Sequence, residues 1–391
     1  MPYAEGRTFL DADSHIMELP DFVHSHADPG MRERIAPLSF SAGGKMGRRL
    51  EEYARVGSHA PEVVAELERN VIGGAKGYEA LGSFNKMERT RALDLLGFHA
   101  QLVFASFAPG TILWQRDLEA RYAGCRAHNR AMAEFCAEDP RLLPVGLLSL
   151  ADPELAVREL EAAFELGIGA VWIPAEPCGG RSPGHNDLDP VWARLAEAGV
   201  PFVLHVGGQR IQVRDEYMNT GREIPSDWLG GGENVRSKDV TVLHQSAEEF
   251  LSVMVLDGVL ERHPGLRGGA IELGATWVPG LLRRLDHAAT IWAKSEPELR
   301  AFSRKPSEQI REQLAFTPYP FEDVGALIRE SADDLYLFSS DYPHYEGGRN
   351  PIGRFEESLG DLPESTRQRF YADNFLKILP CAVELAPPAA A

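Results

Sequence analysis

The ten residues L-F-S-S-D-Y-P-H-Y-E, at positions 337–346, decide how the rest of the chain is interpreted. A short apolar run over 336–338 is typical of a buried strand. Two serines and Asp341 follow this run, and Pro343 prevents the strand from continuing because proline lacks the N–H that a sheet requires. Asp341 is therefore predicted at the carboxyl end of a strand, which in a parallel α/β barrel is the edge that carries the chemistry. The alternative is that Asp341 caps a turn, as aspartate often does.

Seven other apolar segments alternate with segments of helical spacing. Strands that alternate with helices indicate a parallel sheet, and eight such units indicate a closed barrel rather than an open sheet. The sequence contains no G-x-G-x-x-G after a strand and no P-loop, which leaves a nucleotide-binding sheet with little support. We therefore expect an α/β protein, a distorted TIM (β/α)8 barrel with C-terminal helices. The expected strands occupy 8–12, 101–105, 143–148, 170–173, 201–206, 266–272, 314–317 and 335–339.

The segment over 16–85 separates the first two expected strands and is rich in glycine, serine, proline and charge. Long loops in barrels are usually functional. We expect this insertion to form short helices over the barrel mouth, which is the face where the strands end. A single domain is expected over 1–380, followed by a frayed tail over 381–391.

The net charge of −18 over 391 residues argues against a nucleic-acid or anionic-membrane partner, because both repel an acidic surface. No segment is apolar for long enough to cross a bilayer, and the first ten residues lack the apolar run of a signal peptide. The four cysteines form no C-x-x-C pair, so we expect reduced thiols and a cytoplasmic location.

Four of the expected strands end in residues that bind metal ions. The first strand provides Asp13 and His15, which are two positions apart and therefore share a face. The fifth, sixth and eighth strands provide His205, Glu272 and Asp341. Imidazole and carboxylate together suit Zn²⁺, and also Mn²⁺ or Fe²⁺. Taken singly, His205 could be a hydrogen-bonded core histidine and Glu272 a member of a buried ion pair, but their coincidence at strand ends favours a metal site.

The chain resembles the amidohydrolase superfamily. Within it, the chain is most similar to the subgroup that contains aminocarboxymuconate semialdehyde decarboxylase and the decarboxylases related to γ-resorcylate decarboxylase. The resemblance runs from Thr8 to about Phe375. It rests on the motifs D-A-D-S-H, F-V-L-H-V-G-G, G-V-L-E-R-H-P, I-E-L-G-A-T-W-V-P and F-S-S-D-Y-P-H.

This resemblance implies one divalent metal ion at the barrel mouth, with zinc expected first and manganese or iron as alternatives. It assigns the ligands to Asp13, His15, His205 and Asp341, and it implies catalytic roles for Asp341, Glu272 and His205. Two positions depart from the family pattern. The first-strand motif usually reads H-x-H, where this chain has Asp13, and the sixth strand usually ends in a catalytic histidine, where it has Glu272. Glu272 could ligate the ion or carry a proton, and we favour the proton-carrier role.

Five further residues are candidates for substrate binding. Two histidines could replace the missing catalytic histidine, and three arginines could bind a substrate carboxylate through two parallel hydrogen bonds. For each one alone, an ordinary polar loop or surface residue is the competing interpretation. The candidates are His244, His344, Arg210, Arg236 and Arg349.

Three functions are compatible with these observations. The resemblance favours metal-dependent decarboxylation of an aromatic or unsaturated carboxylic acid. The alternatives are metal-dependent hydrolysis of a C–N, C–O or C–C bond, and a non-catalytic barrel that binds a small molecule. The expected partner is a small-molecule substrate, a carboxylic acid in the first case, and the resemblance implies a homodimer.

Overall fold

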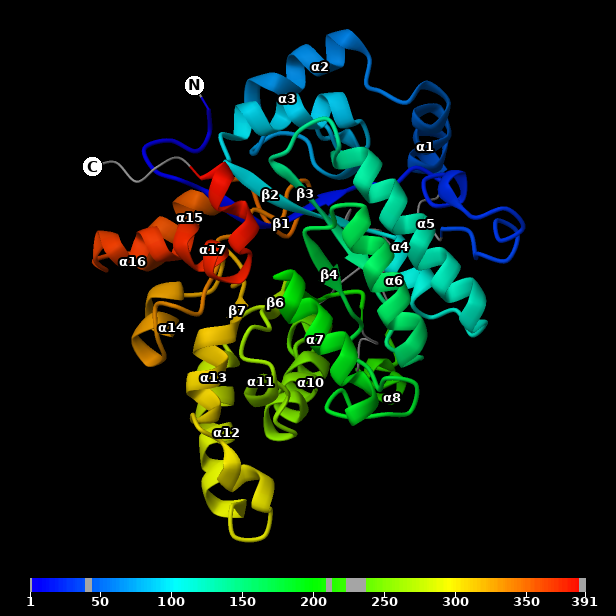
Figure 1. Cartoon of the computed structure of the whole chain (residues 1–391). Helices are drawn as coiled ribbons and strands as arrows, with labels where there is room; N and C mark the ends of the chain where they lie inside the picture. The colour runs from blue at the N-terminus through cyan, green and yellow to red at the C-terminus, as the bar shows by residue number, and fades with distance from the viewer. Residues whose placement is uncertain (1, 39–43, 209–212, 223–236, 387–391) are drawn as a thin grey trace.

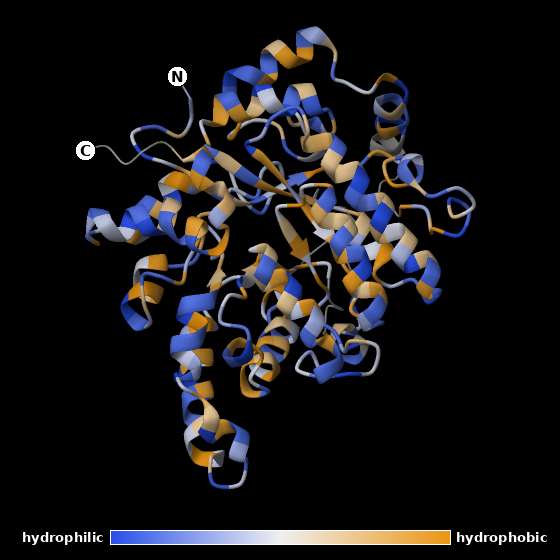
Figure 2. Ribbon diagram, in the orientation of Figure 1, coloured by the Kyte–Doolittle hydropathy of each residue, from blue (hydrophilic) through white to orange (hydrophobic). Residues whose placement is uncertain are grey.

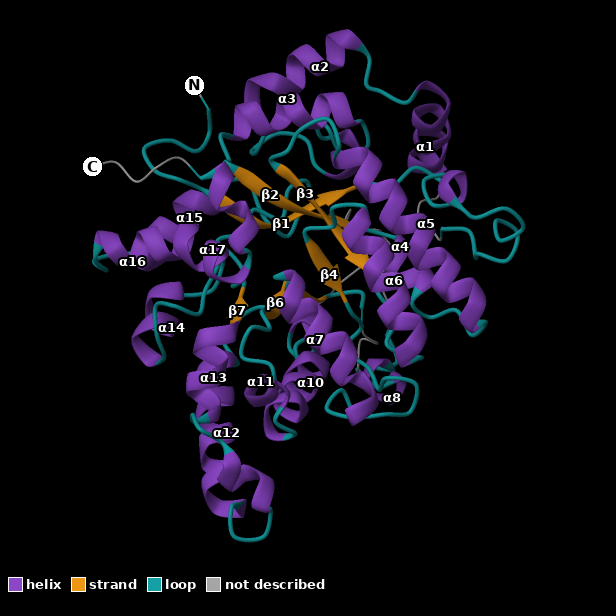
Figure 3. Cartoon of the chain, viewed as in Figure 1, coloured by secondary structure: helices purple, strands orange, loops and turns teal. Residues whose placement is uncertain are grey.

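The computed structural model describes residues 2–38, 44–208, 213–222 and 237–386. Within them, seven parallel strands form one curled sheet in which each strand is hydrogen-bonded to the next along the chain (Figures 1 and 3). The strands are β1 (Leu10–Ile16), β2 (Ala100–Ala105), β3 (Leu142–Leu147), β4 (Ala170–Trp172), β5 (Phe202–His205), β6 (Gly268–Ile271) and β7 (Leu314–Phe316). Parallel neighbours in sequence order require a helix or long connection between each pair, as the α/β alternation predicts.

The expected eighth strand over 335–339 is not a regular strand, and this part of the prediction is wrong. The segment is nevertheless extended and closes the ring between β7 and β1. On one side, Phe316 donates its N–H to Leu335 (2.8 Å). On the other side, Ala12 donates to Phe338 (3.0 Å) and Asp341 donates to Asp13 (2.9 Å). Asp341 has a φ of +51°, so the chain turns before a continuous ladder with β1 can form.

Helices surround the strands, with their polar residues outward and apolar residues toward the sheet (Figure 2). Several begin at side-chain caps: Asn85 accepts from the N–H of Glu88, and Asp152 accepts from Leu155. The first helices are α1 (Gly44–Val56), α2 (Pro61–Leu67), α3 (Lys86–Leu96), α4 (Ala108–Ile112), α5 (Leu118–Cys136), α6 (Pro153–Glu165), α7 (Asp189–Ala198) and α8 (Asp215–Met218). The later helices are α9 (Ser237–Val240), α10 (Gln245–Leu256), α11 (Val259–Arg262), α12 (Val278–Trp292), α13 (Pro306–Gln313), α14 (Val324–Glu330), α15 (Pro351–Leu359), α16 (Glu364–Gln368) and α17 (Asn374–Ile378).

The sequence pattern predicts one long helix over 240–262, but the structure has α9 ending at Val240 and two separate helices, α10 and α11, after it. Gly258 separates the last two with a φ of +74°, a left-handed conformation that glycine adopts without steric penalty. Beyond β6, α12 projects from the body of the molecule (Figure 1). No helix among the described residues is long and apolar enough to span a bilayer.

The insertion between β1 and α3 contains α1, α2 and short 3-10 turns. Its last part is fastened to the loop that follows Asp341. Gly77 donates its N–H to the carbonyl of Pro343 (2.9 Å), and the Tyr342 hydroxyl donates to the carbonyl of Leu81 (2.7 Å). Residues 77–81 therefore lie beside the turn that carries Asp341.

Candidate metal centre

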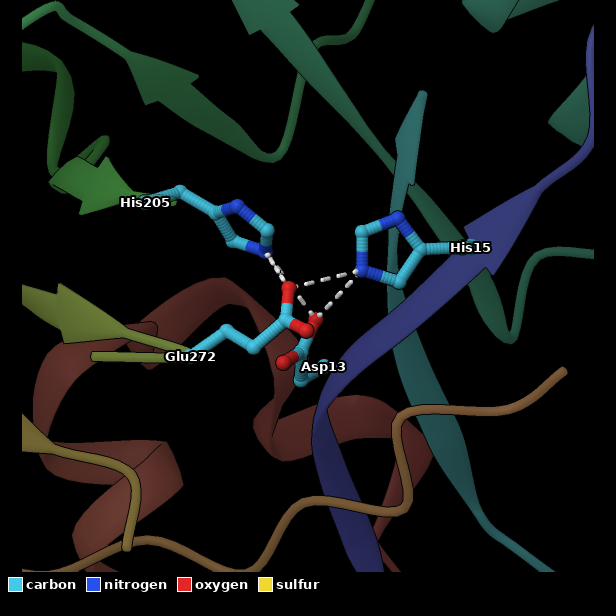
Figure 4. Close-up of side chains that lie close together, drawn as sticks. All are labelled: Asp13, His15, His205 and Glu272. Atoms are coloured by element: carbon cyan, nitrogen blue, oxygen red, sulfur yellow. Dashed lines mark hydrogen bonds and ion pairs between the residues drawn. The ribbon is translucent and has the colours of Figure 1, made fainter. Parts of the chain in front are cut away.

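Four buried side chains meet where β1, β5 and β6 end (Figure 4). Asp13 and His15 share the inward face of β1, as their spacing predicts. His205 is the last residue of β5, and Glu272 follows the last residue of β6. One ligand atom from each of the four lies within 4.8 Å of the others.

The distances between these atoms fit a single divalent ion. His15 Nε2 lies 3.2 Å from Asp13 Oδ1 and 3.6 Å from Glu272 Oε2. His205 Nε2 lies 3.4 Å from Asp13 Oδ1 and 3.3 Å from Glu272 Oε2. Donors about 2.1 Å from a tetrahedral ion are about 3.4 Å from one another. The four donors are thus spaced as a metal site requires.

The imidazole of His205 is oriented for metal binding. Its Nδ1 lies 2.8 Å from the carbonyl oxygen of Val206, which can only accept a hydrogen bond. The proton of the neutral ring is therefore on Nδ1, and the lone pair of Nε2 points toward the carboxylates. A backbone carbonyl that fixes the tautomer in this way is typical of metal-binding histidines.

Asp13 remains ionised in this environment. Burial alone would raise its pKa, but the interactions of the carboxylate with the His15 and His205 rings outweigh burial and hold the pKa of Asp13 below its usual range. Two residues earlier in β1, burial raises the pKa of Asp11 to about 7 although Ser340 and Gln101 donate hydrogen bonds to it. Asp11 accepts both the N–H (2.8 Å) and the hydroxyl (2.6 Å) of Ser340, and so it holds the residue before Asp341.

Asp341 lies beside the four donors and belongs to a second group with His15, Glu272 and His344. Its Oδ1 is 3.6 Å from His15 Nε2 and 3.3 Å from His344 Nδ1. Within the described part of the chain, Asp341 Oδ2 has no hydrogen-bond partner, and the contact of Oδ1 with His344 Nδ1 is long. This carboxylate is therefore available to a ligand or a substrate.

His344 is part of the centre rather than a surface loop residue. Its ring stacks on His15 with the centroids 3.9 Å apart. The Ser106 hydroxyl donates to the carbonyl of Ile16 and accepts from His344 Nε2 at 2.7 Å. Although burial and His15 lower it, Asp341 raises the pKa of His344 above its usual value.

Of the other predicted substrate residues, His244 and Arg349 belong to neither group. Arg210 and Arg236 lie outside the described residues. His244 stacks on Trp277 and lies 3.7 Å from Glu248. Arg349 follows the Asp341 loop and is exposed.

Sequence patterns did not indicate Lys76, Thr317 or Tyr319. Lys76 is only 5% exposed, and its nearest charged neighbours include Asp341. Thr317 and Tyr319 contact the backbone of Glu272 through their hydroxyls. Lysine, threonine and tyrosine are common at loop positions and form no recognisable motif here. Only the three-dimensional contacts therefore identify these three residues.

Two similar proteins are decarboxylases by name. The chain is 26% identical over 276 residues to decarboxylase orsB of Emericella nidulans, a match that covers 70% of this chain and 78% of that protein. It is 26% identical over 305 residues to γ-resorcylate decarboxylase of Polaromonas sp., with 74% of this chain and 86% of that protein covered.

Solved structures share the fold. An amidohydrolase of Mycobacterium avium subsp. paratuberculosis matches with a TM-score of 0.74 and 27% identity over 96% of this chain and 100% of that one. A dihydroxybenzoic acid decarboxylase of Polaromonas sp., solved with manganese and the inhibitor 2-nitroresorcinol, matches with a TM-score of 0.61 and 18% identity over 97% and 99% of the two chains. The distorted barrel expected from the sequence is thereby confirmed.

The sequence model described as amidohydrolase matches residues 88–380, which is most of the chain. The resemblance drawn from the sequence motifs is confirmed by this match and by the two decarboxylases. The same matches confirm the expectation of a metal-dependent lyase or hydrolase of this superfamily. The protein belongs to the amidohydrolase family.

Proposed function

We propose that this protein is a metal-dependent decarboxylase of an aromatic or unsaturated carboxylic acid. The observation that carries the proposal is the set of donors at the ends of β1, β5 and β6, spaced for one ion, with the Asp341 carboxylate beside it. The two similar decarboxylases support this reaction over hydrolysis.

We assign the ion to Asp13, His15, His205 and Glu272. This set keeps three of the four ligands that the family resemblance implied. Glu272, for which the sequence favoured a proton-carrier role, replaces Asp341 in it, because Glu272 Oε2 lies as close to His205 Nε2 as Asp13 does. Nitrogen and oxygen donors without sulfur suit zinc, with manganese or iron as alternatives. When bound, the ion would supply positive charge that polarises the substrate's oxygen atoms.

We assign proton transfer to Asp341. Decarboxylation breaks the bond between the substrate's carbon skeleton and its carboxylate, which leaves as carbon dioxide, and the electron pair stays on the carbon. That carbon then needs one proton, which Asp341 can deliver in its protonated form and regain from water. His344 Nδ1 lies 3.3 Å from Asp341 Oδ1 and can orient this carboxylate.

An acidic substrate can be attracted to this site only if a positively charged side chain adds to the charge of the metal ion. Asp13, Glu272 and Asp341 together carry three negative charges when ionised, and a divalent ion neutralises two. An added substrate carboxylate would then meet a net negative centre. Lys76 lies near Asp341 and Glu346, and Arg349 lies near Lys76, so these two cations can attract the substrate.

We further infer that the insertion over 16–85 covers the barrel mouth. The hydrogen bonds of Gly77 and Leu81 to the loop after Asp341 support this inference. A homodimer stays an expectation from the family resemblance, and light scattering of the purified protein would measure it.

The proposed reaction is tested with purified protein loaded separately with zinc and manganese. Each form is incubated with a panel of aromatic and unsaturated acids, amides and lactones. Release of carbon dioxide, with a product lighter by that mass, is the expected result for at least one acid. Water added across an amide or lactone, with no carbon dioxide from any acid, would instead assign the protein to the hydrolases. Absence of both metal and turnover would favour a binding protein.

A further inference from the structure

The side chain of Glu272 points to the opposite side of the sheet from the one that regular strand alternation predicts. Its neighbour Ile271 faces into the barrel, where it lines an apolar cavity with Leu102 and Val203. Successive side chains of a strand point to opposite faces, so an extended Glu272 would point out of the barrel. Instead, Glu272 has a φ of +53°, and its carboxylate lies 3.3 Å from His205 Nε2. The left-handed backbone turns this side chain toward the metal centre.

A left-handed conformation is disfavoured for any residue with a Cβ, so the surrounding structure must hold it. Two side chains that follow β7 bind both backbone groups of Glu272. Its N–H donates to the hydroxyl of Thr317 (2.8 Å), and its carbonyl accepts from the hydroxyl of Tyr319 (2.7 Å). A carbonyl oxygen can only accept, so the Tyr319 hydroxyl is the donor of this hydrogen bond.

The sheet itself explains why a hydroxyl is needed at Thr317. Pairing of β6 with β7 continues until Thr317 donates its N–H to the carbonyl of Ala270 (3.1 Å). The next N–H of the β6 chain belongs to Glu272. It meets the Thr317 side chain rather than a backbone carbonyl, so Glu272 can leave the extended conformation with its N–H still satisfied.

Tyr319 is fixed in turn by Glu322. The Glu322 carboxylate accepts the N–H of Tyr319 (2.7 Å) and the N–H of Thr276 (2.9 Å). It thereby joins the loop after β7 to the loop after β6. Gly274 lies between them, so close that an added Cβ would be 3.2 Å from the Tyr319 ring.

We propose that Thr317 and Tyr319 are positioning residues of the metal centre, which hold Glu272 in its left-handed conformation and so direct its carboxylate to a divalent cation. This inference rests on the proposed function, because it assumes that an ion binds there. It adds two residues that touch neither ion nor substrate, and it gives each a defined partner atom.

The test measures the dissociation constant of Mn²⁺ from chelator-treated full-length protein. We expect Thr317→Val and Tyr319→Phe each to weaken Mn²⁺ binding by about 10- to 100-fold, the usual effect of removing a group that orients a ligand. Thr317→Ser keeps the hydroxyl, so its dissociation constant for Mn²⁺ should stay within about threefold of that of the natural protein. This result is expected if the hydrogen bond from Glu272 N–H to the hydroxyl is what matters. Near-ultraviolet circular dichroism checks that each variant is folded, and Tyr319→Phe and Thr317→Ser decide the matter if Thr317→Val does not fold.

A double-mutant cycle separates positioning from general stability. If Thr317 acts through Glu272, Thr317→Val should have little further effect on Mn²⁺ binding once Glu272→Gln is present. Full additivity of the two substitutions would overturn the inference, as would natural affinity in both Thr317→Val and Tyr319→Phe. A natural protein that binds neither Mn²⁺ nor Zn²⁺ would instead contradict the proposed metal site itself, and the inference with it.

Discussion

Replacing Lys76 by methionine should make the metal-free protein more stable. Lys76 is 5% exposed, and its Nζ has no hydrogen-bond partner among the described residues. Another shielded lysine, Lys377, differs because its Nζ donates to the carbonyls of Arg311 (2.8 Å) and Asp334 (2.5 Å). A buried ammonium without such partners is held at a cost in folding free energy.

The size of this cost follows from the pKa of Lys76. Burial lowers it from 10.5 to about 8, although Asp341 and Glu346 act in the opposite direction. A difference of this size corresponds to about 3 kcal/mol of folding free energy. Above pH 10.5 the amine is neutral in both the folded and the unfolded chain, so the penalty vanishes. As the pH falls, the unfolded chain takes up the proton first, and the full penalty is present below pH 8.

Urea unfolding of chelator-treated protein measures the effect. Lys76→Met keeps the apolar stem and should raise the free energy of unfolding by about 3 kcal/mol at pH 7 and by about 1.5 kcal/mol at pH 9.5. The matched control is Lys86→Met, because Lys86 is partly exposed and pairs with Glu138 (3.1 Å). Its unfolding free energy should change by no more than about 0.5 kcal/mol. A Lys76→Met protein no more stable than the natural one at pH 7, or a gain independent of pH, would refute the reasoning.

Three other substitutions test the metal centre. Glu272→Gln should weaken metal binding roughly 10³-fold. The reason is that the attraction between one carboxylate charge and a divalent ion about 2.1 Å away is about 4 kcal/mol even at the dielectric constant of water. Unchanged metal content together with lost turnover would instead make Glu272 a proton carrier. Asp341→Asn removes the same charge beside the site and should keep the metal while turnover falls by about 10²- to 10⁴-fold, measured as carbon dioxide release. His15→Ala should lose the metal in elemental analysis and keep its helical circular dichroism, and retention of the ion would remove His15 from the ligands.

The donors that the sequence indicated are those whose direction follows from regular strand geometry. Asp13 and His15 share a face because they are two positions apart, and His205 ends a strand whose Val203 also faces the interior. Such an alternation is visible in the sequence itself. The strand order and the barrel could be predicted for the same reason, since each strand is a short apolar run between helical segments.

The limits of β1 could not be predicted in this way. The pattern predicts a strand over 8–12, but β1 is Leu10–Ile16 and includes the polar D-A-D-S-H motif. Buried polar residues are uncommon, so this motif suggests a loop. It is tolerated inside the barrel because distant residues satisfy it: Gln101 donates to Asp11, and the buried Arg89 donates to the Ser14 hydroxyl and to the carbonyl of His15.

Glu272 and Asp341 share a feature that no sequence pattern contains. Among the described residues, they are the two non-glycine residues with a positive φ, and both lie at the metal centre. Such conformations persist where surrounding contacts enforce them, and they concentrate at functional sites. The contacts here come from far along the chain: Asp13 accepts the N–H of Asp341, and Thr317 accepts the N–H of Glu272. The end of a strand therefore predicts that a carboxylate lies near the barrel mouth, whereas these hydrogen bonds decide whether it faces the candidate metal centre.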